Sequence, residues 1–83
     1  MIANEYKQYL IKWFQNKTNN DDLDHHGNYM NLGYIDSLEI ILLIEEIESE
    51  FKISFDQNDF QNRKFSNING LAELISKKAL MDG

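Results

Sequence analysis

Residues 36–51 read DSLEIILLIEEIESEF, and this segment predicts much of the architecture. Asp36 is a good helix N-cap, and Glu39 three residues later completes a pattern typical of a capping box. Apolar residues then recur every three or four positions, as in a helix with one side in a hydrophobic core. We therefore predict a helix over residues 37–51. Its core-facing stripe comprises Ile40, Leu43, Ile44, Ile47 and Phe51.

The same helix carries a second apolar stripe, formed by Leu38, Ile41 and Leu42. A chain of 83 residues can bury one stripe of such a helix, but burying both would require more chain. We therefore expect the second stripe to form a surface patch rimmed by glutamates, which is typical of a docking surface. The alternative is that the preceding loop covers the first turns of the helix. The predicted partner-binding residues are Leu38, Glu39, Ile41, Leu42, Glu45, Glu46 and Glu48.

Upstream of this segment, apolar side chains recur at spacings of three and four near the start of the chain. They predict an amphipathic helix over residues 3–17. The run TNNDD at residues 18–22 contains poor helix formers, which end the helix. Because Trp13 lies on the apolar stripe, we expect it to serve in packing. The stripe comprises Ile2, Tyr6, Tyr9, Leu10, Trp13 and Phe14.

A last helix is predicted over residues 68–80, with Ser66 or Asn67 as its N-cap. Gly70 falls in its first turn and weakens this helix, because glycine is a poor helix former. The apolar stripe comprises Ile68, Leu71, Ala72, Ile75 and Ala79, with Leu74 beside it.

Two connecting segments remain. The one that ends near residue 35 is long for a small domain, and such loops are often functional. Residues 52–64 show no long periodicity, but Ser54 or Asp56 could begin one short helical turn that ends at Phe60. We expect four apolar side chains of the first loop to hold it against the core, namely Leu23, Tyr29, Met30 and Leu32.

No segment alternates as a strand would, and no repeat or linker is visible. The sequence therefore predicts an all-α fold, a small four-helix bundle with three long helices and one short helix. Eighty-three residues make one domain at most, so residues 1–83 are expected to form a single domain.

The charge pattern limits the possible partners. The net charge is −6, and residues 36–50 hold six acids and no lysine or arginine. Nucleic acids and anionic lipids are repelled by such a surface, whereas basic docking patches are attracted. There is no cysteine, no apolar run long enough to span a bilayer, and no signal-peptide pattern at the start, so we expect a cytoplasmic protein.

The sequence offers no catalytic constellation. No histidine lies near Ser37, so this serine is not expected to be a hydrolase nucleophile, and the chain is not expected to be an enzyme. His25 and His26 lie in a polar loop near three aspartates, but adjacent histidines of this kind are more often solvated than metal-bound. We therefore predict no metal site. A serine beside an N-cap aspartate is most often part of the cap.

The tripeptide Asp36-Ser37-Leu38, with Gly33 just upstream, resembles the 4'-phosphopantetheine attachment motif of acyl and peptidyl carrier proteins. Residues 44–53 and 65–75 also resemble the end of the second helix and the start of the final helix in that family. The resemblance implies a carrier domain with the acyl-carrier-protein fold. It also implies that a separate phosphopantetheinyl transferase uses magnesium to move phosphopantetheine from coenzyme A to Ser37. Asp36 would help to position that transferase, or would only cap the helix.

Two departures from the motif bear on the pathway. Carriers of fatty-acid synthesis usually have one residue between the glycine and the aspartate, whereas Tyr34 and Ile35 stand there in this chain. They also commonly place an acid where this chain has Leu42. The spacing resembles that of D-alanyl carriers and of free-standing carriers of secondary-metabolite or surface-polysaccharide pathways. Both departures argue against housekeeping fatty-acid synthesis without excluding it, so the implied cargo is an amino acid or a short or modified acyl group. The implied partners are the transferase, an acyl- or aminoacyl-loading ligase, and a downstream synthase or transferase, with the carrier a monomer. The alternatives are an unmodified helical protein-interaction module and, less favoured, a small enzyme.

Overall fold

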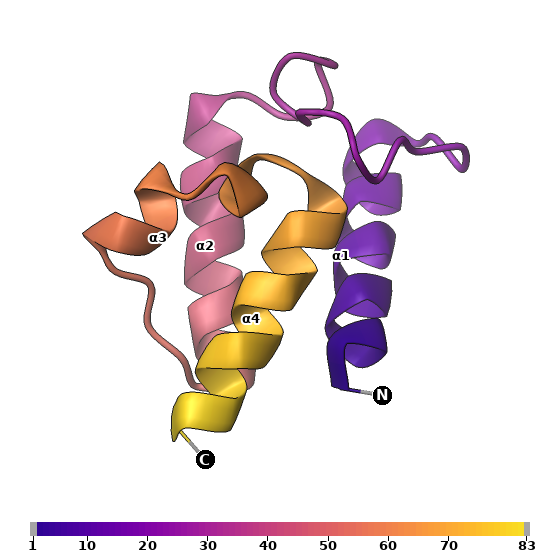
Figure 1. Ribbon diagram of the computed structural model, residues 1–83. Helices are drawn as coiled ribbons and strands as arrows, with labels where there is room; N and C mark the ends of the chain where they lie inside the picture. The colour runs from indigo at the N-terminus through magenta and orange to yellow at the C-terminus, as the bar shows by residue number, and fades with distance from the viewer. Residues whose placement is uncertain (1, 83) are drawn as a thin grey trace.

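The computed structural model describes residues 2–82, and this range is helical with no strand (Figure 1). The elements are α1 (Ile2–Thr18), α2 (Ser37–Phe51), α3 (Gln57–Gln61), the 3-10 helix η1 (Arg63–Ser66) and α4 (Ile68–Asp82). The predicted small bundle of three long helices and one short helix is confirmed. The long helices begin and end within two residues of the predicted limits, whereas η1 was not predicted.

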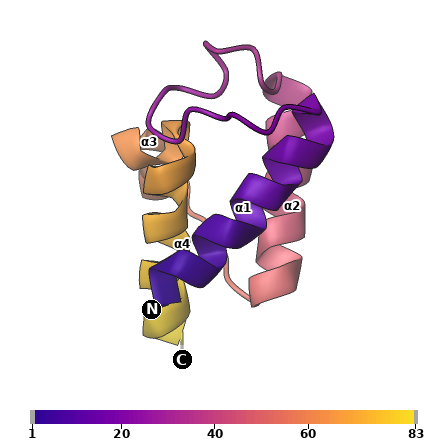
Figure 2. The same cartoon turned by 90° about the vertical axis from the view of Figure 1, so that its right-hand side faces the viewer.

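The three long helices surround one core. Helix α1 packs against α4 and crosses it obliquely, and its last turn comes close to the start of α2 (Figure 2). The long loop between α1 and α2 runs over one end of the bundle, and α3 and η1 lie beside the first half of α4 (Figure 1). No helix within residues 2–82 is long and apolar enough to cross a membrane.

The core-facing stripe of α2 is confirmed. Leu43 and Ile47 are completely buried, and the other three members of the stripe are partly buried against the same core. The ring of Phe51 meets Tyr6 and Tyr9 of α1 edge to face, with centroid separations of 4.8 and 5.0 Å. The buried core residues are Leu10, Phe14, Leu23, Tyr29, Ile35, Leu43, Ile47, Ile53, Phe55, Phe65, Ile68, Leu71, Ala72, Leu74 and Ile75.

The loop between α1 and α2 is held to the core by only two of the four predicted side chains. Leu23 and Tyr29 are buried, but the prediction was wrong for Met30 and Leu32, which are 43% and 45% exposed. The cause is a tight turn in which the backbone N–H of Tyr34 donates to the carbonyl oxygen of Tyr29 at 2.9 Å. The chain doubles back inside this turn, and these two side chains project outward.

Tyr29 also fastens this loop to the junction between η1 and α4. Its backbone N–H donates to the carbonyl oxygen of Ser66 at 3.1 Å, and its hydroxyl donates to the carbonyl oxygen of Phe65. Burial raises the pKa of the Tyr29 hydroxyl well above its ordinary value. In the first turn of α4, the N–H of Asn69 donates to the carbonyl oxygen of His25 at 2.9 Å. The loop before α2 and the start of α4 are therefore joined at several points.

Asp56, rather than Ser54, begins the short helix α3. Its carboxylate accepts the backbone N–H of Asp59 at 3.0 Å, and the Asp59 carboxylate accepts the N–H of Asp56 at 2.8 Å. Asp59 also pairs with Lys78 of α4 at 2.7 Å. Desolvation alone would raise the pKa of Asp59, but its hydrogen bonds to Lys78 and to the Asp56 backbone outweigh this and lower it. This contact fixes α3 to α4.

Asn67, rather than Ser66, caps α4, because its side-chain oxygen accepts the backbone N–H of Gly70 at 2.6 Å. Gly70 is buried, and a Cβ atom at this position would lie 2.4 Å from the carbonyl oxygen of Lys64 in η1. The glycine that weakens the sequence pattern of the helix thus permits close contact between α4 and η1.

Helix α2 ends at Phe51, and the C-cap residue Lys52 adopts the left-handed conformation with φ 57° and ψ 44°. We expect Lys52→Gly to raise the free energy of unfolding by about 0.5–1 kcal/mol. The left-handed conformation costs a residue with a side chain roughly 1–2 kcal/mol, and glycine removes this cost. Glycine also raises the conformational entropy of the unfolded chain, which offsets about half of the stabilisation. Urea unfolding checks this. Lys77→Gly, at an exposed position within α4, is the control and should lose about 1 kcal/mol. Equal losses in both variants would show that Lys52 is unstrained.

Candidate functional site

Ser37 is the first residue of α2 and is exposed. The capping box beside it is formed by its neighbours, as predicted. The backbone N–H of Glu39 donates to Asp36 Oδ1 at 2.8 Å, and the N–H of Asp36 donates to Glu39 Oε1 at 3.1 Å. The Ser37 hydroxyl makes no hydrogen bond within the part of the chain that the structure describes. The helix start is therefore satisfied without this hydroxyl, which remains open to a modifying enzyme.

The electrostatics around Ser37 suit an attached phosphate. The first N–H groups of a helix have no acceptor within the helix, and the N-terminal end of the helix dipole is positive. Glu39 adds negative charge here, but its carboxylate accepts the Asp36 N–H and lies 3.5 Å from Lys17 Nζ. The Asp36 carboxylate is likewise bound to the N–H of Glu39. Both acids are thus partly neutralised, and the N–H groups of Ser37 and Leu38 remain available.

The residues just before Ser37 hold it in place. Gly33 has a φ of 78°, a conformation that favours glycine and that turns the chain toward α2. Ile35 is buried in the core. The Tyr34 hydroxyl accepts the backbone N–H of Asp24 at 2.9 Å, which ties the end of the loop to its middle. Ser37 therefore lies at an exposed but well-supported junction between loop and helix.

A cavity of about 280 Å³ opens close to this junction, between the loop, α2 and the α3–η1 segment. Ile40, one helical turn after Ser37, lies on its wall, and Ile44 follows one turn further on. Much of the lining is apolar, with some polar groups at its edge. The lining residues are Asn28, Tyr29, Met30, Ile40, Ile44, Phe60, Asn62, Phe65 and Ser66. Sequence analysis did not identify this cavity, because three separate segments form it.

A family model described as "Phosphopantetheine attachment site" matches residues 10–75, which include about half of α1, all of α2 and about half of α4. The chain belongs to this family. The match covers more than half of the chain, and it confirms the resemblance that the sequence suggested. No curated protein and no solved structure matches the chain.

Membership of the phosphopantetheine-attachment family establishes the kind of protein. The family is defined by covalently attached 4'-phosphopantetheine, so the cofactor prediction is confirmed. The chain has the role of a phosphopantetheine carrier, and such domains act with partner enzymes and are generally not catalytic themselves. The exposed hydroxyl and open N–H groups at the start of α2 fit the attachment of a phosphodiester.

The second apolar stripe of α2 lies at the surface. Leu38, Ile41 and Leu42 are 68%, 54% and 47% exposed, so the preceding loop does not cover the first turns of the helix. This patch is the candidate docking surface of the carrier. Its exposure agrees with the expectation from sequence, because α2 buries only its other stripe in the core.

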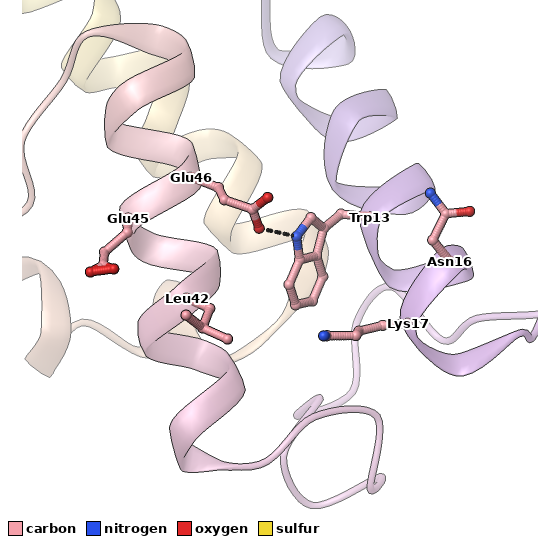
Figure 3. Close-up of a pocket in the computed structure, with 6 residues that line it drawn as sticks. All are labelled: Trp13, Asn16, Lys17, Leu42, Glu45 and Glu46. Carbon is pink, nitrogen blue, oxygen red and sulfur yellow. Dashed lines mark hydrogen bonds between the residues drawn. The ribbon is translucent and has the colours of Figure 1, made fainter.

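The four glutamates predicted to surround this patch are in different situations. Glu45 is exposed and makes no side-chain hydrogen bond or ion pair within residues 2–82. Glu39 belongs to the capping box, and Glu46 accepts the indole N–H of Trp13 at 2.6 Å (Figure 3). Glu48 is half-buried and accepts the backbone N–H of Phe55 at 2.8 Å, so it holds the segment after α2. Sequence analysis predicted the capping-box role of Glu39 but missed the contacts of Glu46 and Glu48, because each joins residues that are distant along the chain or lie in an irregular segment.

The histidine-bearing loop has a structural role. The Asp24 carboxylate accepts the backbone N–H groups of His26 and Gly27 at 3.0 and 3.1 Å, and the His25 carbonyl oxygen accepts from α4. In the described part of the chain, no group of three or more His, Cys, Asp or Glu side chains is placed to hold a metal ion.

We expect Asp36→Ala to destabilise the protein by about 0.5–2 kcal/mol, because it removes the N-cap of α2 and half of the capping box. We also expect slower transfer of phosphopantetheine, because the start of α2 is then less well ordered. Thermal melts and a time course of intact mass measure the two effects. Asp21→Ala, at an exposed loop position, is the control. An Asp36→Ala variant that matches this control in both assays would leave Asp36 without either role.

Proposed function

We propose that Ser37 is the attachment site and that the chain carries an activated acyl or aminoacyl group for a biosynthetic pathway. The observation that supports this most strongly is the exposed Ser37 hydroxyl at the start of α2, which makes no hydrogen bond within residues 2–82, in a chain of the phosphopantetheine-attachment family. A hydroxyl engaged in capping would have to be released before modification, whereas here Asp36 provides the cap.

In the proposed reaction, the Ser37 oxygen forms a phosphodiester bond to the phosphopantetheine phosphorus. The pyrophosphate bond of coenzyme A breaks, and adenosine 3',5'-bisphosphate leaves. The transferase supplies the magnesium and accepts the serine proton. The chain itself presents the hydroxyl, keeps the helix start ordered through Asp36, and offers its first N–H groups to the phosphate. Once bound, phosphopantetheine supplies a terminal thiol that holds the cargo as a thioester.

We further propose a specialised pathway rather than housekeeping fatty-acid synthesis. The two residues between Gly33 and Asp36, and the apolar Leu42 on the exposed stripe, support this. The cavity beside Ile40 supports a small cargo, because its volume of about 280 Å³ lies just below the usual range of ligand pockets. We propose that the carrier acts as a cytoplasmic monomer with a loading ligase and a downstream synthase or transferase.

Intact-mass measurement tests the proposal. The purified chain is incubated with coenzyme A, magnesium and a broad-specificity phosphopantetheinyl transferase. We expect the mass to rise by one phosphopantetheine group, and peptide mapping to place the group on Ser37. Omitting coenzyme A is the control. A chain that stays unmodified with an active transferase would contradict the proposal and would favour the unmodified interaction module.

We predict that Leu38→Ala and Ile41→Ala slow the loading of phosphopantetheine by the transferase. Each should cost well under 1 kcal/mol of stability, because both side chains are exposed. Ile47→Ala, on the buried stripe of the same helix, should cost about 2–5 kcal/mol. Loading rates and urea unfolding separate the two stripes. Leu80→Ala removes an exposed leucine from α4 and is the matched control for loading. If all three exposed variants load at the same rate, the docking surface lies elsewhere.

A further inference from the structure

Two neighbouring residues, Asn69 and Gly70, have a reactivity that the carrier role does not use. They form the single Asn-Gly pair in the sequence. In such a pair the backbone nitrogen of the glycine can attack the side-chain amide carbon of the asparagine, because glycine has no Cβ atom to hinder the approach. The pair lies in the first turn of α4, with Gly70 buried and Asn69 half-buried. A reactive pair is therefore built into a helix of the fold.

The packing of α4 against η1 requires the glycine of this pair. A Cβ atom at Gly70 would lie 2.4 Å from the carbonyl oxygen of Lys64, so a larger residue would displace η1. The Asn69 side chain makes no hydrogen bond within residues 2–82, and it is partly open to water. Any restraint on the reaction must therefore come from the backbone of the helix start and from the groups bound to it.

Asn67 provides that restraint. The N–H of Gly70 donates to Asn67 Oδ1 at 2.6 Å, and the N–H of Leu71 donates to the Asn67 carbonyl oxygen at 2.9 Å. The Gly70 nitrogen can attack only when its proton is released, and the first of these bonds retains that proton. Ring closure also requires rotation about the Cα–C bond of Asn69, which would open the turn that the second bond closes. The N-cap of α4 therefore opposes the reaction in two ways.

We propose that Asn69 is a deamidation site and that the Asn67 cap protects it. In the reaction, the Gly70 nitrogen forms a bond to Asn69 Cγ, and the bond from Cγ to the side-chain nitrogen breaks. Ammonia leaves with the proton of the Gly70 amide. Water then opens the cyclic imide at one of its two carbonyl carbons, which gives aspartate or isoaspartate. Water is the only co-reactant.

The modification would alter the link between α4 and the loop before Ser37. In the imide the Gly70 nitrogen carries no proton, so Asn67 loses the donor that it caps. Isoaspartate adds a methylene group to the main chain at this point. The helix start then cannot keep both its close contact with η1 and its backbone hydrogen bond to the carbonyl oxygen of His25. A covalent change in α4 would therefore free part of the loop that leads to Ser37.

The test uses the full chain, kept folded in mildly alkaline buffer for several days, with the same chain unfolded in guanidinium as the reference. Trypsin then releases residues 65–77, which contain both Asn67 and Asn69. Mass spectrometry detects the small mass gain of an amide converted to an acid, and fragment ions assign it to one of the two residues. Chromatography separates the aspartate product from the isoaspartate product.

We expect Asn69 of the folded chain to deamidate at least about tenfold more slowly than Asn69 of the unfolded chain, because the reaction must await local opening of α4. Asn67→Ala removes the cap and should speed the reaction in the folded chain about threefold or more. Asn67→Asp keeps a capping oxygen, so it should react as slowly as wild type does.

Asp36→Ala controls for a general loss of stability, because it removes the N-cap of α2 and leaves α4 unchanged. Its Asn69 should deamidate at about the wild-type rate. If Asn67→Ala does not fold, amide hydrogen exchange in the wild-type chain decides instead. The factor by which folding slows exchange at Gly70 should then match, within about tenfold, the factor by which it slows deamidation at Asn69.

Equal rates in the folded and unfolded chain would overturn the inference, because the fold would then give no protection. A folded Asn67→Ala variant that reacts no faster than Asn67→Asp would overturn the role of the cap. So would a mismatch between exchange and deamidation larger than the stated factor.

The effect on the loop rests on the proposed function. Chain that contains isoaspartate should take up phosphopantetheine more slowly than unconverted chain, with Asn69→Ala, incubated in the same way, as the control for other damage. Equal uptake by converted and unconverted chain would overturn the link to Ser37. Absence of uptake by every sample would contradict the proposed function, while the deamidation rates would stand.

Discussion

Replacing Ser37 with alanine is expected to abolish phosphopantetheine uptake completely while leaving the fold intact. Alanine has no oxygen that could form the phosphodiester bond. The stability change should stay within about 1 kcal/mol, because Asp36 caps α2 and the Ser37 hydroxyl makes no hydrogen bond in the described range. Intact mass after incubation with coenzyme A and the transferase measures uptake, and thermal melts measure stability.

Ser49→Ala is the matched control, because Ser49 is an exposed serine on the same helix. This variant should be loaded as wild type is. Modification that persists in Ser37→Ala would place the attachment elsewhere. Loss of uptake in both variants would instead indicate that the transferase requires the whole helix surface.

The largest loss of stability from a single added methyl group is expected for Gly70→Ala. The new Cβ would lie 2.4 Å from the carbonyl oxygen of Lys64, 2.7 Å from its Cα and 2.9 Å from its carbonyl carbon. These are backbone atoms, so no rotamer change relieves the overlap, and η1 must move away from α4. Alanine is the better helix former by about 1 kcal/mol. Overpacking costs roughly 1–3 kcal/mol, and an overlap with backbone atoms belongs in the upper half of that range, about 2–3 kcal/mol. We therefore expect a net loss of about 1–2 kcal/mol.

Urea unfolding of Gly70→Ala tests this expectation, with Asn69→Ala as the control. Asn69 lies in the same first turn of α4, and its contact to His25 uses the backbone N–H, which alanine keeps. This control should change stability by less than about 0.5 kcal/mol. A Gly70→Ala variant more stable than wild type would mean that η1 yields easily and that helix propensity dominates.

The long helices could be predicted because each has a continuous apolar stripe, and because Asp36 and Asn67 are strong caps. These signals are local, so they can be recognised in the sequence without knowledge of the tertiary structure. Met30 and Leu32 could not be placed correctly, since the direction of a side chain in a loop depends on the turn. The packing role of Gly70 could not be predicted either. It depends on close contact with η1, a segment without periodicity in the sequence.

The candidate site was predictable to a similar extent. Ser37 became the candidate through its motif and its predicted position at a helix start, and the structure confirms that position. The roles of the glutamates were less predictable, because Glu46 and Glu48 are engaged by Trp13 and by the backbone of Phe55. A line of acids on a helix shows that a surface is negative, but it does not show which acids also hold the fold together.

The links between Tyr29, His25 and the start of α4 also affect how the protein moves. The loop before Ser37 cannot open without breaking the bonds to Ser66 and Asn69 and exposing the buried Tyr29 ring. The loop and the first turn of α4 therefore form one cooperative unit, and their bonded amides should exchange hydrogen with solvent at similar rates. Ser37 thus follows a rigidly held segment of the fold. If Ser37 carries the prosthetic arm as proposed, the distance between successive enzymes must be covered by that arm or by diffusion of the whole carrier.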